Sequence, residues 1–336
     1  MICMGALLLF PALVWSQARD SVFLQNGQVL IGELKNISLG LLTLDETDLK
    51  IIKIKVYKIK YVVAESDNFR IETIDKQTYY SQLHRGSSPG STRIFEGERS
   101  KELSLLNISG LISLHKGFFN SLDGSLGIGF SYTKSSKIGQ LTTNSTIYYS
   151  AKKFENQFTL SSIASIDSSV YSRDNESVQV FSNYNFTESW FLAAQVNYQR
   201  NLELSIARRF QELVGAGNKF IVRNDMQLLG ITGINLAQER STEGAESFLV
   251  ELPLMLRFNF FKYQRYNIKL SAYQTAYIGI TDAGRFRYDG NLTYSQELIH
   301  NFYINLTFYS SFDSRPPDNN SGKTDFGTSL SISYQF

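Results

Sequence analysis

The amino-acid sequence predicts an all-β protein, with a transmembrane antiparallel β-barrel of about twelve strands that follows a small all-β repeat region. Three observations predict this fold class. The chain is rich in Tyr and Phe and contains only 5 Pro, and aromatic residues favour strands. Apolar and polar residues alternate with period two over long segments. The connections between these segments are alternately short and long, as in transmembrane barrels.

Residues 1–18 contain a continuous apolar run, "MICMGALLLFPALVWSQA". This run is too short for a membrane-spanning helix, which needs about 20 apolar residues. We interpret it as a secretory signal peptide that is cut near Arg19, after the small residues Ser16 and Ala18. Cleavage would also remove Cys3, the single cysteine. The mature chain would then form no disulfide, thiolate metal site or cysteine nucleophile.

Residues 19–113 are expected to form a periplasmic β-rich region with two weak repeats. "NGQ" at 26–28 matches "DKQ" at 75–77. At the same offset, four apolar positions of the first unit match four of the second: Ile54, Val56, Ile59 and Val62 correspond to Leu103, Leu105, Ile108 and Leu111. Each unit reads as a half-open barrel of about five strands, and Asn26-Gly27 suits a tight hairpin turn.

Two stretches of this region allow further interpretation. "KIIKIKVYKIKY" alternates Lys with Ile and Val. Such alternation is typical of a strand with one solvated face, and an anion- or headgroup-binding stripe is the alternative interpretation. "HRGSSPGSTRIFEGE" is polar and rich in turn-forming residues, so it is expected to be a loop within the second unit.

Residues 118–336 keep one pattern to the end, in which segments of alternating residues are separated by polar connections. The short connections are "KKFEN", "FTES", "KFIVRN", "FFKYQRYN" and "LIHN". The long connections are "KSSKIGQ", "SIDSSVYSRDNES", "RNLELSIAR", "AQERSTEGAES", "ITDAGRFR" and "FDSRPPDNNSGKTD". Because short and long connections alternate, they are expected at opposite ends of the barrel, with the short turns in the periplasm.

The two faces of single segments predict which side chains point into the barrel. In "SFLVELPLMLRFNFF", even-numbered positions are apolar and several odd-numbered positions are charged or polar. A barrel in lipid places the apolar face outside and leaves no unpaired backbone edge. The polar residues expected to face the lumen are Glu251, Arg257, Asn259, Arg287, Asp289, Asn291, Glu297 and Asn305.

The carboxy-terminal segment "SLSISYQF" places Leu330, Ile332, Tyr334 and Phe336 on one face. It resembles the assembly signal with which the barrels of Gram-negative outer membranes end. The resemblance implies recognition by the barrel-assembly machinery, pairing of the last strand with the first, and a position of Phe336 at the periplasmic rim.

A longer resemblance covers roughly residues 118–336. "FYINLTFYSSFDSRPPDNNSGKTDFGTSLSISYQF", with its Ser-Arg-Pro-Pro loop and Thr-Asp pair, resembles the salt-induced outer-membrane protein (YdiY-like) family, catalogued mainly as a domain of unknown function. "GSLGIGFSYTKSSKIGQLTTNSTIYYS" looks like the first hairpin of that family, and "RRFQELVGAGNKFI" looks like its Gly-rich mid-barrel strand. The resemblance implies an outer-membrane barrel and names no substrate.

The sequence shows no pattern of an enzyme. The 3 histidines, His84, His115 and His300, have no neighbouring serine or carboxylate pattern that indicates a dyad. "GAGNKF" lacks the glycine fingerprint of a nucleotide site. No metal or other cofactor is expected, and a formal net charge of +2 gives no indication of nucleic-acid binding.

Two function classes remain open on these grounds, both in the outer membrane of a Gram-negative bacterium and in contact with its lipids. The first is a narrow pore or transport-associated barrel. The second is a structural or interaction protein with a plugged barrel, whose periplasmic region binds a partner or peptidoglycan. About twelve strands enclose a narrow interior, between filled eight-stranded barrels and open porins.

Overall fold

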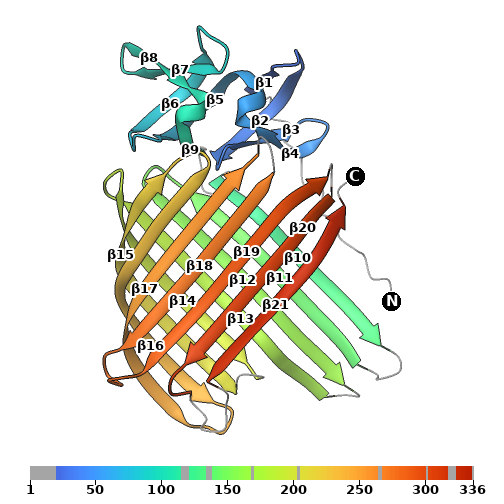
Figure 1. The fold of residues 1–336 in the computed structure, drawn as a ribbon, viewed down its shortest axis with the longest axis vertical. Helices are drawn as coiled ribbons and strands as arrows, with labels where there is room; N and C mark the ends of the chain where they lie inside the picture. Colours follow the sequence, from blue (N-terminus) through green and yellow to red (C-terminus); the bar gives the residue numbers. More distant parts are fainter. Residues whose placement is uncertain are drawn as a thin grey trace, which may run out of the picture.

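The computed structural model describes residues 20–114, 121–133, 138–167, 170–202, 205–263, 267–299, 302–316 and 323–334. They form two antiparallel sheets, one of 9 strands and one of 12, and the second curls into a barrel (Figure 1). The chain passes from the first sheet to the second between Leu114 and Leu122. The predicted all-β class and the number of barrel strands are confirmed. No described helix combines the length and apolar character needed to cross a bilayer.

The first sheet and two short 3₁₀ helices make up the amino-terminal domain. Its elements are β1 Asp20–Leu24, β2 Val29–Ser38, β3 Leu41–Glu46, β4 Lys50–Lys55, η1 Val56–Lys58, β5 Ile59–Thr73, β6 Thr78–Arg85, β7 Ser91–Glu96, β8 Arg99–Ser104, η2 Leu105–Asn107 and β9 Ile108–Leu114. The expected loop at 84–98 is wrong in part, because β7 occupies its centre and pairs with β6 and β8.

The domain consists of two units with the same order of elements. The first unit ends in the first half of β5, and the second unit begins in the second half. Corresponding turns have the same backbone geometry, since Gly27 and Lys76 both have a positive φ, of 90° and 63°. The amide of Val56 bonds to the carbonyl of Gly40, as the amide of Leu105 does to that of Gly90.

The two units share strands and one hydrophobic core. Strand β9 pairs with β5 of its own unit and with β2 of the first unit, where Ile112 lies opposite Asn36. The core cluster draws fully buried side chains from both units, among them Leu34, Phe69 and Ile108. The units are therefore halves of one folding domain.

A fragment that contains residues 20–114 is expected to be soluble and folded without the barrel. We expect this because all residues of the core cluster lie between Val22 and Leu111, within the fragment. Circular dichroism and dispersed amide signals in NMR would check this expectation. An unfolded or aggregated fragment would show that the domain needs the barrel for its stability.

The barrel strands pair in sequence order, each with the next along the chain. They are β10 Leu122–Thr133, β11 Ile138–Ser150, β12 Phe154–Asp167, β13 Val170–Asn185, β14 Trp190–Asn201, β15 Ile206–Val222, β16 Met226–Ser241, β17 Glu246–Lys262, β18 Ile268–Gly279, β19 Phe286–Ile299, β20 Phe302–Asp313 and β21 Thr324–Tyr334. The connection expected in "SIDSSVYSRDNES" is mostly strand, since β12 and β13 extend into it.

The two surfaces of the barrel differ in polarity. On β17, the even-numbered Phe248, Leu254 and Leu256 are exposed on the outside, with exposed fractions of 54%, 46% and 49%. The odd-numbered Glu251 between them is only 1% exposed, on the inside. The outer surface therefore presents apolar side chains, and the interior holds charged ones.

In the described part of the chain, the two edge strands of this sheet, β10 and β21, are not paired with each other. Among the described residues, β10 pairs only with β11 and β21 only with β20, so the expected pairing of the last strand with the first is wrong here. Strand β10 carries Gly124, Gly127 and Gly129. Glycine weakens the interior of a strand, because it has no side chain to pack and loses more entropy on ordering.

Candidate functional site

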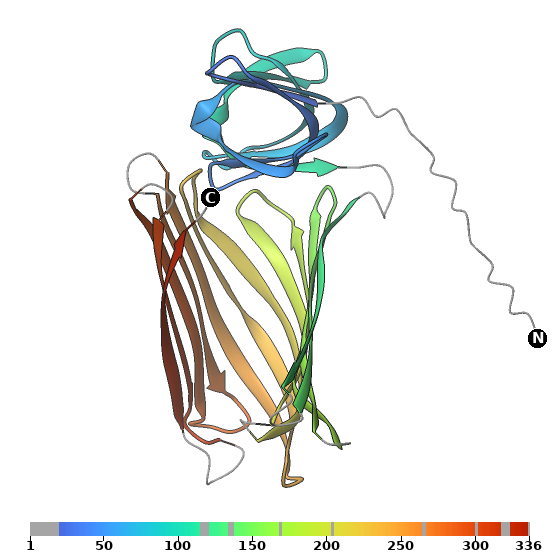
Figure 2. The same cartoon turned by 90° about the vertical axis from the view of Figure 1, so that its right-hand side faces the viewer.

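The amino-terminal domain lies over one mouth of the barrel (Figure 2). This is the end with the short connections, because Tyr80, Leu106 and Lys55 of the domain contact the β11–β12, β15–β16 and β17–β18 turns, respectively. Beneath the domain lies a chamber of about 790 Å³. Its lining comes from both parts of the chain, with β2, β5 and β9 above and strands of the barrel below. The chamber is therefore closed on one side by the domain.

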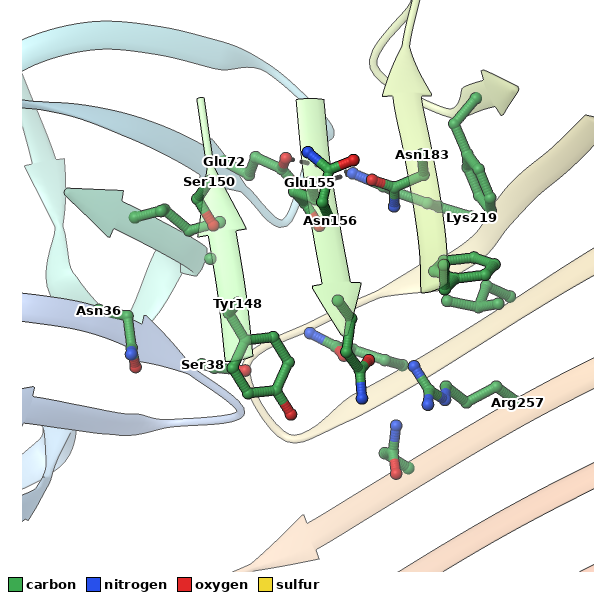
Figure 3. A pocket seen from close by; sticks show the side chains of 18 of the residues that line it. Asn36, Ser38, Glu72, Tyr148, Ser150, Glu155, Asn156, Asn183, Lys219 and Arg257 are labelled. Atoms are coloured by element: carbon green, nitrogen blue, oxygen red, sulfur yellow. Dashed lines mark hydrogen bonds and ion pairs between the residues drawn. The ribbon is translucent and has the colours of Figure 1, made fainter. Parts of the chain in front are cut away.

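Four charged residues join the domain to the barrel wall, and we call them the ion-pair cluster: Arg70 and Glu72 on β5, Glu155 on β12 and Lys219 on β15 (Figure 3). Arg70 is 3% exposed and pairs with Glu155, and the Nζ of Lys219 lies 3.0 Å from a carboxylate oxygen of Glu72. Burial alone would lower the pKa of Arg70, but the nearby Glu155 and Glu72 raise it. Two cations and two anions thus neutralise one another.

Further contacts hold the domain at separate points of the rim. Lys76 donates a hydrogen bond of 2.9 Å to the carbonyl of Lys219. The hydroxyl of Tyr80 donates to the carbonyl of Lys152, whose ammonium lies 4.6 Å from the centre of the Tyr80 ring. Lys55 lies 5.4 Å from the ring centre of Tyr263. These contacts fix the domain by polar groups, which suits an interface that can open.

One side of the chamber is apolar, and we call it the apolar wall: Phe181, Phe191, Leu229, Ile231 and Met255. They project inward from β13, β14, β16 and β17. The glycine-rich strand β15 makes room for this wall, because a Cβ at Gly217 would lie 2.2 Å from the ring of Phe191. Phe191 can be 2% exposed inside a barrel for this reason.

Arg257 lies beside the apolar wall and lines the chamber (Figure 3). It stands opposite Leu229 on β16 and opposite Tyr273 on β18. Its side chain has neither an ion-pair partner nor a hydrogen bond among the described residues. The amide side chains of Gln227 and Asn259 also line the chamber. The chamber therefore offers one unpaired guanidinium next to apolar surface.

A second cluster of charges lies at the opposite end of the barrel, and we call it the far-end network: Arg209, Glu239, Glu251, Arg285, Arg287 and Asp313. Glu251 accepts hydrogen bonds of 2.8 and 2.7 Å from Arg287 and one of 2.9 Å from Asn235. Arg285 pairs with Asp313 at 2.7 Å. Four of them, Glu239, Glu251, Arg285 and Arg287, are at most 5% exposed, so they fill part of the lumen at this end.

The structure brings only some of the residues expected in the lumen together. Glu251 and Arg287 are in contact, whereas Arg257 and Asn259 lie in the chamber at the other end. The remaining ones have separate local partners. Ser311 donates to Asp289, Thr293 to Asn291, Asn267 to Glu297 and Ser295 to Asn305. They form no single site.

The residues of the expected assembly signal lie on the last strand. Leu330 and Ile332 are 67% and 72% exposed on the outer face of β21. Tyr334 stands opposite Phe302 at the rim that faces the amino-terminal domain. Phe336 lies outside the described residues.

The histidines offer no catalytic arrangement in the described part of the chain. His84 Nδ1 lies 2.6 Å from a carboxylate oxygen of Glu65, on the surface of the amino-terminal domain. His115 and His300 lie outside the described residues. Within those residues, no group of three or more His, Cys, Asp and Glu side chains is placed to hold a metal ion.

The fold and the chamber define a class: a twelve-stranded antiparallel barrel with an apolar outer surface and a two-unit β domain over its mouth. Residues 126–336 match the model of a family described as "Protein of unknown function, DUF481", and the chain belongs to that family. This agrees with the resemblance found in the sequence. No curated protein matches the chain.

Several solved barrels are similar to the chain at low identity. A NanC porin has a TM-score of 0.36 and 8% identity, over 63% of this chain and 100% of its own. OccK11 (OpdR) of Pseudomonas aeruginosa has a TM-score of 0.32 and 11% identity, over 80% of this chain and 83% of its own. A further porin has a TM-score of 0.28 and 10% identity, over 80% and 98%.

Sequence reasoning missed the ion-pair cluster and the apolar wall. Arg70 sits in an ordinary alternating stretch, "NFRIET", and its partner is distant in sequence. One pattern in the sequence does indicate the apolar wall. "WFLAAQV" at 190–196 is apolar on both faces, which a strand between lipid and a watery lumen does not require.

Proposed function

We propose that the protein is a narrow outer-membrane pore, with the amino-terminal domain as a cap on its periplasmic mouth. The observation that carries the proposal is the chamber, whose lining belongs to both parts of the chain. The apolar outer surface suits contact with membrane lipids, and the short turns at the capped end suit the periplasmic side. The proposal includes assembly by the barrel-assembly machinery and no catalytic activity.

The cap is held by contacts that can be broken one at a time. The ion-pair cluster bridges two independent sheets, and each sheet keeps its own core when the bridge opens. A small solute that enters from the far end would meet the far-end network first, then the chamber, and then the cap. Passage therefore requires the cap to move.

Replacement of Lys219 by methionine is expected to raise the open probability of the reconstituted protein about tenfold, because it removes the ion pair between Glu72 of the domain and the barrel wall without changing the core of either part. Single-channel currents in planar bilayers would measure this. Arg223→Met is the control, because Arg223 pairs with Asp225 on the same rim and is 60% exposed. Silence of the unchanged protein and of Lys219→Met would contradict the pore.

A second candidate function is a structural or interaction protein with a plugged lumen. The observation that favours it is the far-end network, whose members Glu239 and Glu251 are 3% and 1% exposed. In this case the amino-terminal domain would bind a periplasmic partner or peptidoglycan. The same bilayer experiment separates the two candidates, since a plugged barrel carries no steady current.

A further inference from the structure

The chamber combines features that the pore alone does not explain. A water-filled pore needs a polar lining. This chamber instead has an apolar wall on one side, whose partly buried Phe181 and Leu229 face it and pack against the buried Phe191 and Met255, and one unpaired cation beside it. Its volume of about 790 Å³ lies within the range of small-molecule sites. We propose that the chamber binds a small amphipathic anion, with its charged head on Arg257 and its alkyl body on the apolar wall.

The head of such a ligand has one suitable partner in the chamber. Three other cations also line it, but each pairs with a carboxylate: Lys35 with Glu33, Arg70 with Glu155, and Lys219 with Glu72. Arg257 has no such carboxylate. Asp123 on β10 is the lining carboxylate outside the cluster, and it forms no ion pair with Arg257. A guanidinium presents several donors in a fixed plane, which suits a carboxylate or phosphate head.

Two buried polar atoms indicate that the chamber is built for an occupant. Ser113 Oγ and Asn183 Oδ1 both line it, are shielded from solvent and have no hydrogen-bond partner. Buried polar atoms without partners are rare, because desolvation costs free energy unless a hydrogen bond replaces the lost water. Both atoms are available to a polar group of a ligand or to water that it holds.

The apolar wall favours an alkyl body over a sugar or a peptide. Its side chains form a continuous cluster across β13, β14, β16 and β17, and Arg257 lies two residues from Met255 on the same face of β17. A ligand can therefore contact both at once. Removing an alkyl chain from water is favourable in proportion to the apolar area that is buried. The inference deepens the proposed function, but it needs only the chamber and no current through it.

Octanoate is the probe, titrated by isothermal calorimetry into the full chain in nanodiscs of zwitterionic lipid. Saturable binding is expected, and Arg257→Gln should weaken it about tenfold. Leu229→Gln should weaken it about fivefold, since the partly buried Leu229 lines the chamber opposite Arg257 and the body would lose apolar contact there. Arg240→Gln is the matched control, because Arg240 is 53% exposed on the far end of β16 and should leave binding unchanged.

Several outcomes would overturn the proposal. Equal affinity for acetate would show that the apolar wall takes no part, and tighter binding of octyltrimethylammonium would assign the site to Asp123. An unchanged affinity of Arg257→Gln would show that the head does not bind Arg257, and an unchanged affinity of Leu229→Gln would show that the body does not contact the apolar wall. Nanodiscs that contain an anionic lipid distinguish the source of the ligand. Weaker binding of octanoate in these nanodiscs would show that the lipid headgroup occupies the same site. If Arg257→Gln fails to fold, Arg257→Lys, which keeps the charge, must still bind octanoate.

Discussion

Replacement of Arg287 by methionine is expected to lower the free energy of unfolding by about 3–5 kcal/mol, because it leaves a buried carboxylate without its cation. Glu251 is 1% exposed and would keep only the amide of Asn235 as a partner. The guanidinium also lies 4.6 Å from the ring centre of Tyr277, and that contact would be lost as well. Urea titration of the protein in lipid vesicles would measure the shift.

Arg315→Met is the control for this prediction. Arg315 pairs with Asp282 at the same end of the barrel, but the two side chains are 55% and 33% exposed. Exposed ion pairs contribute only about 0–1 kcal/mol, so the control should shift the urea midpoint little. The double variant Arg287→Met with Glu251→Leu should recover much of the loss, since no charge is then left unpaired. Equal shifts of the urea midpoint for Arg287→Met and Arg315→Met would mean that water reaches the far-end network and solvates its charges.

Leu306→Arg is expected to impair assembly or to lower the free energy of unfolding by about 2–4 kcal/mol, because the new charge faces lipid in the middle of β20. Leu306 is 40% exposed on the outer face and stands opposite Leu330. Asn305→Arg is the matched variant, one residue away and directed into the lumen. It should be tolerated or change the conductance, although it loses the hydrogen bond from Ser295.

Heat-modifiable mobility in gels and urea titration in vesicles would compare the two variants. Local propensity and depth in the membrane are nearly matched, so the direction of the side chain is the main difference. If Asn305→Arg costs as much as Leu306→Arg, the outer face has been assigned wrongly. A soluble β-sandwich would then explain the alternation better than a barrel in lipid.

The strands and their faces could be predicted from the sequence because a strand directs successive side chains to opposite sides. The alternation in "SFLVELPLMLRFNFF" is enough to place Glu251 inside and Leu254 outside. The repeat in the amino-terminal domain is visible because a polar turn and four apolar positions recur at the same offset, and the turn residues Gly27 and Lys76 both have a positive φ. These features depend on neighbours along the chain.

The candidate site could not be predicted, because its contacts join residues that are distant in sequence. Arg287 meets Glu251 across an intervening strand, 36 positions apart in the chain. Arg70 meets Glu155 across two sheets. The burial of Phe191 depends on a glycine of the next strand. Alternation alone gives the side of each residue and leaves the register between distant strands undetermined.

The pairing of β9 with β2 in the amino-terminal domain constrains when this domain can fold. Strand β2 completes its pairing only with β9, which ends at Leu114, directly before the barrel. The first unit therefore waits for the last strand of the second, and long-range pairing of this kind slows folding because a long loop must close first. In the proposed periplasmic location, the whole domain would have to leave the translocation channel before its core can form. Until then its unpaired strand edges would be accessible to chaperones. When β9 pairs and covers them, the first barrel strands would emerge next, because β10 begins at Leu122.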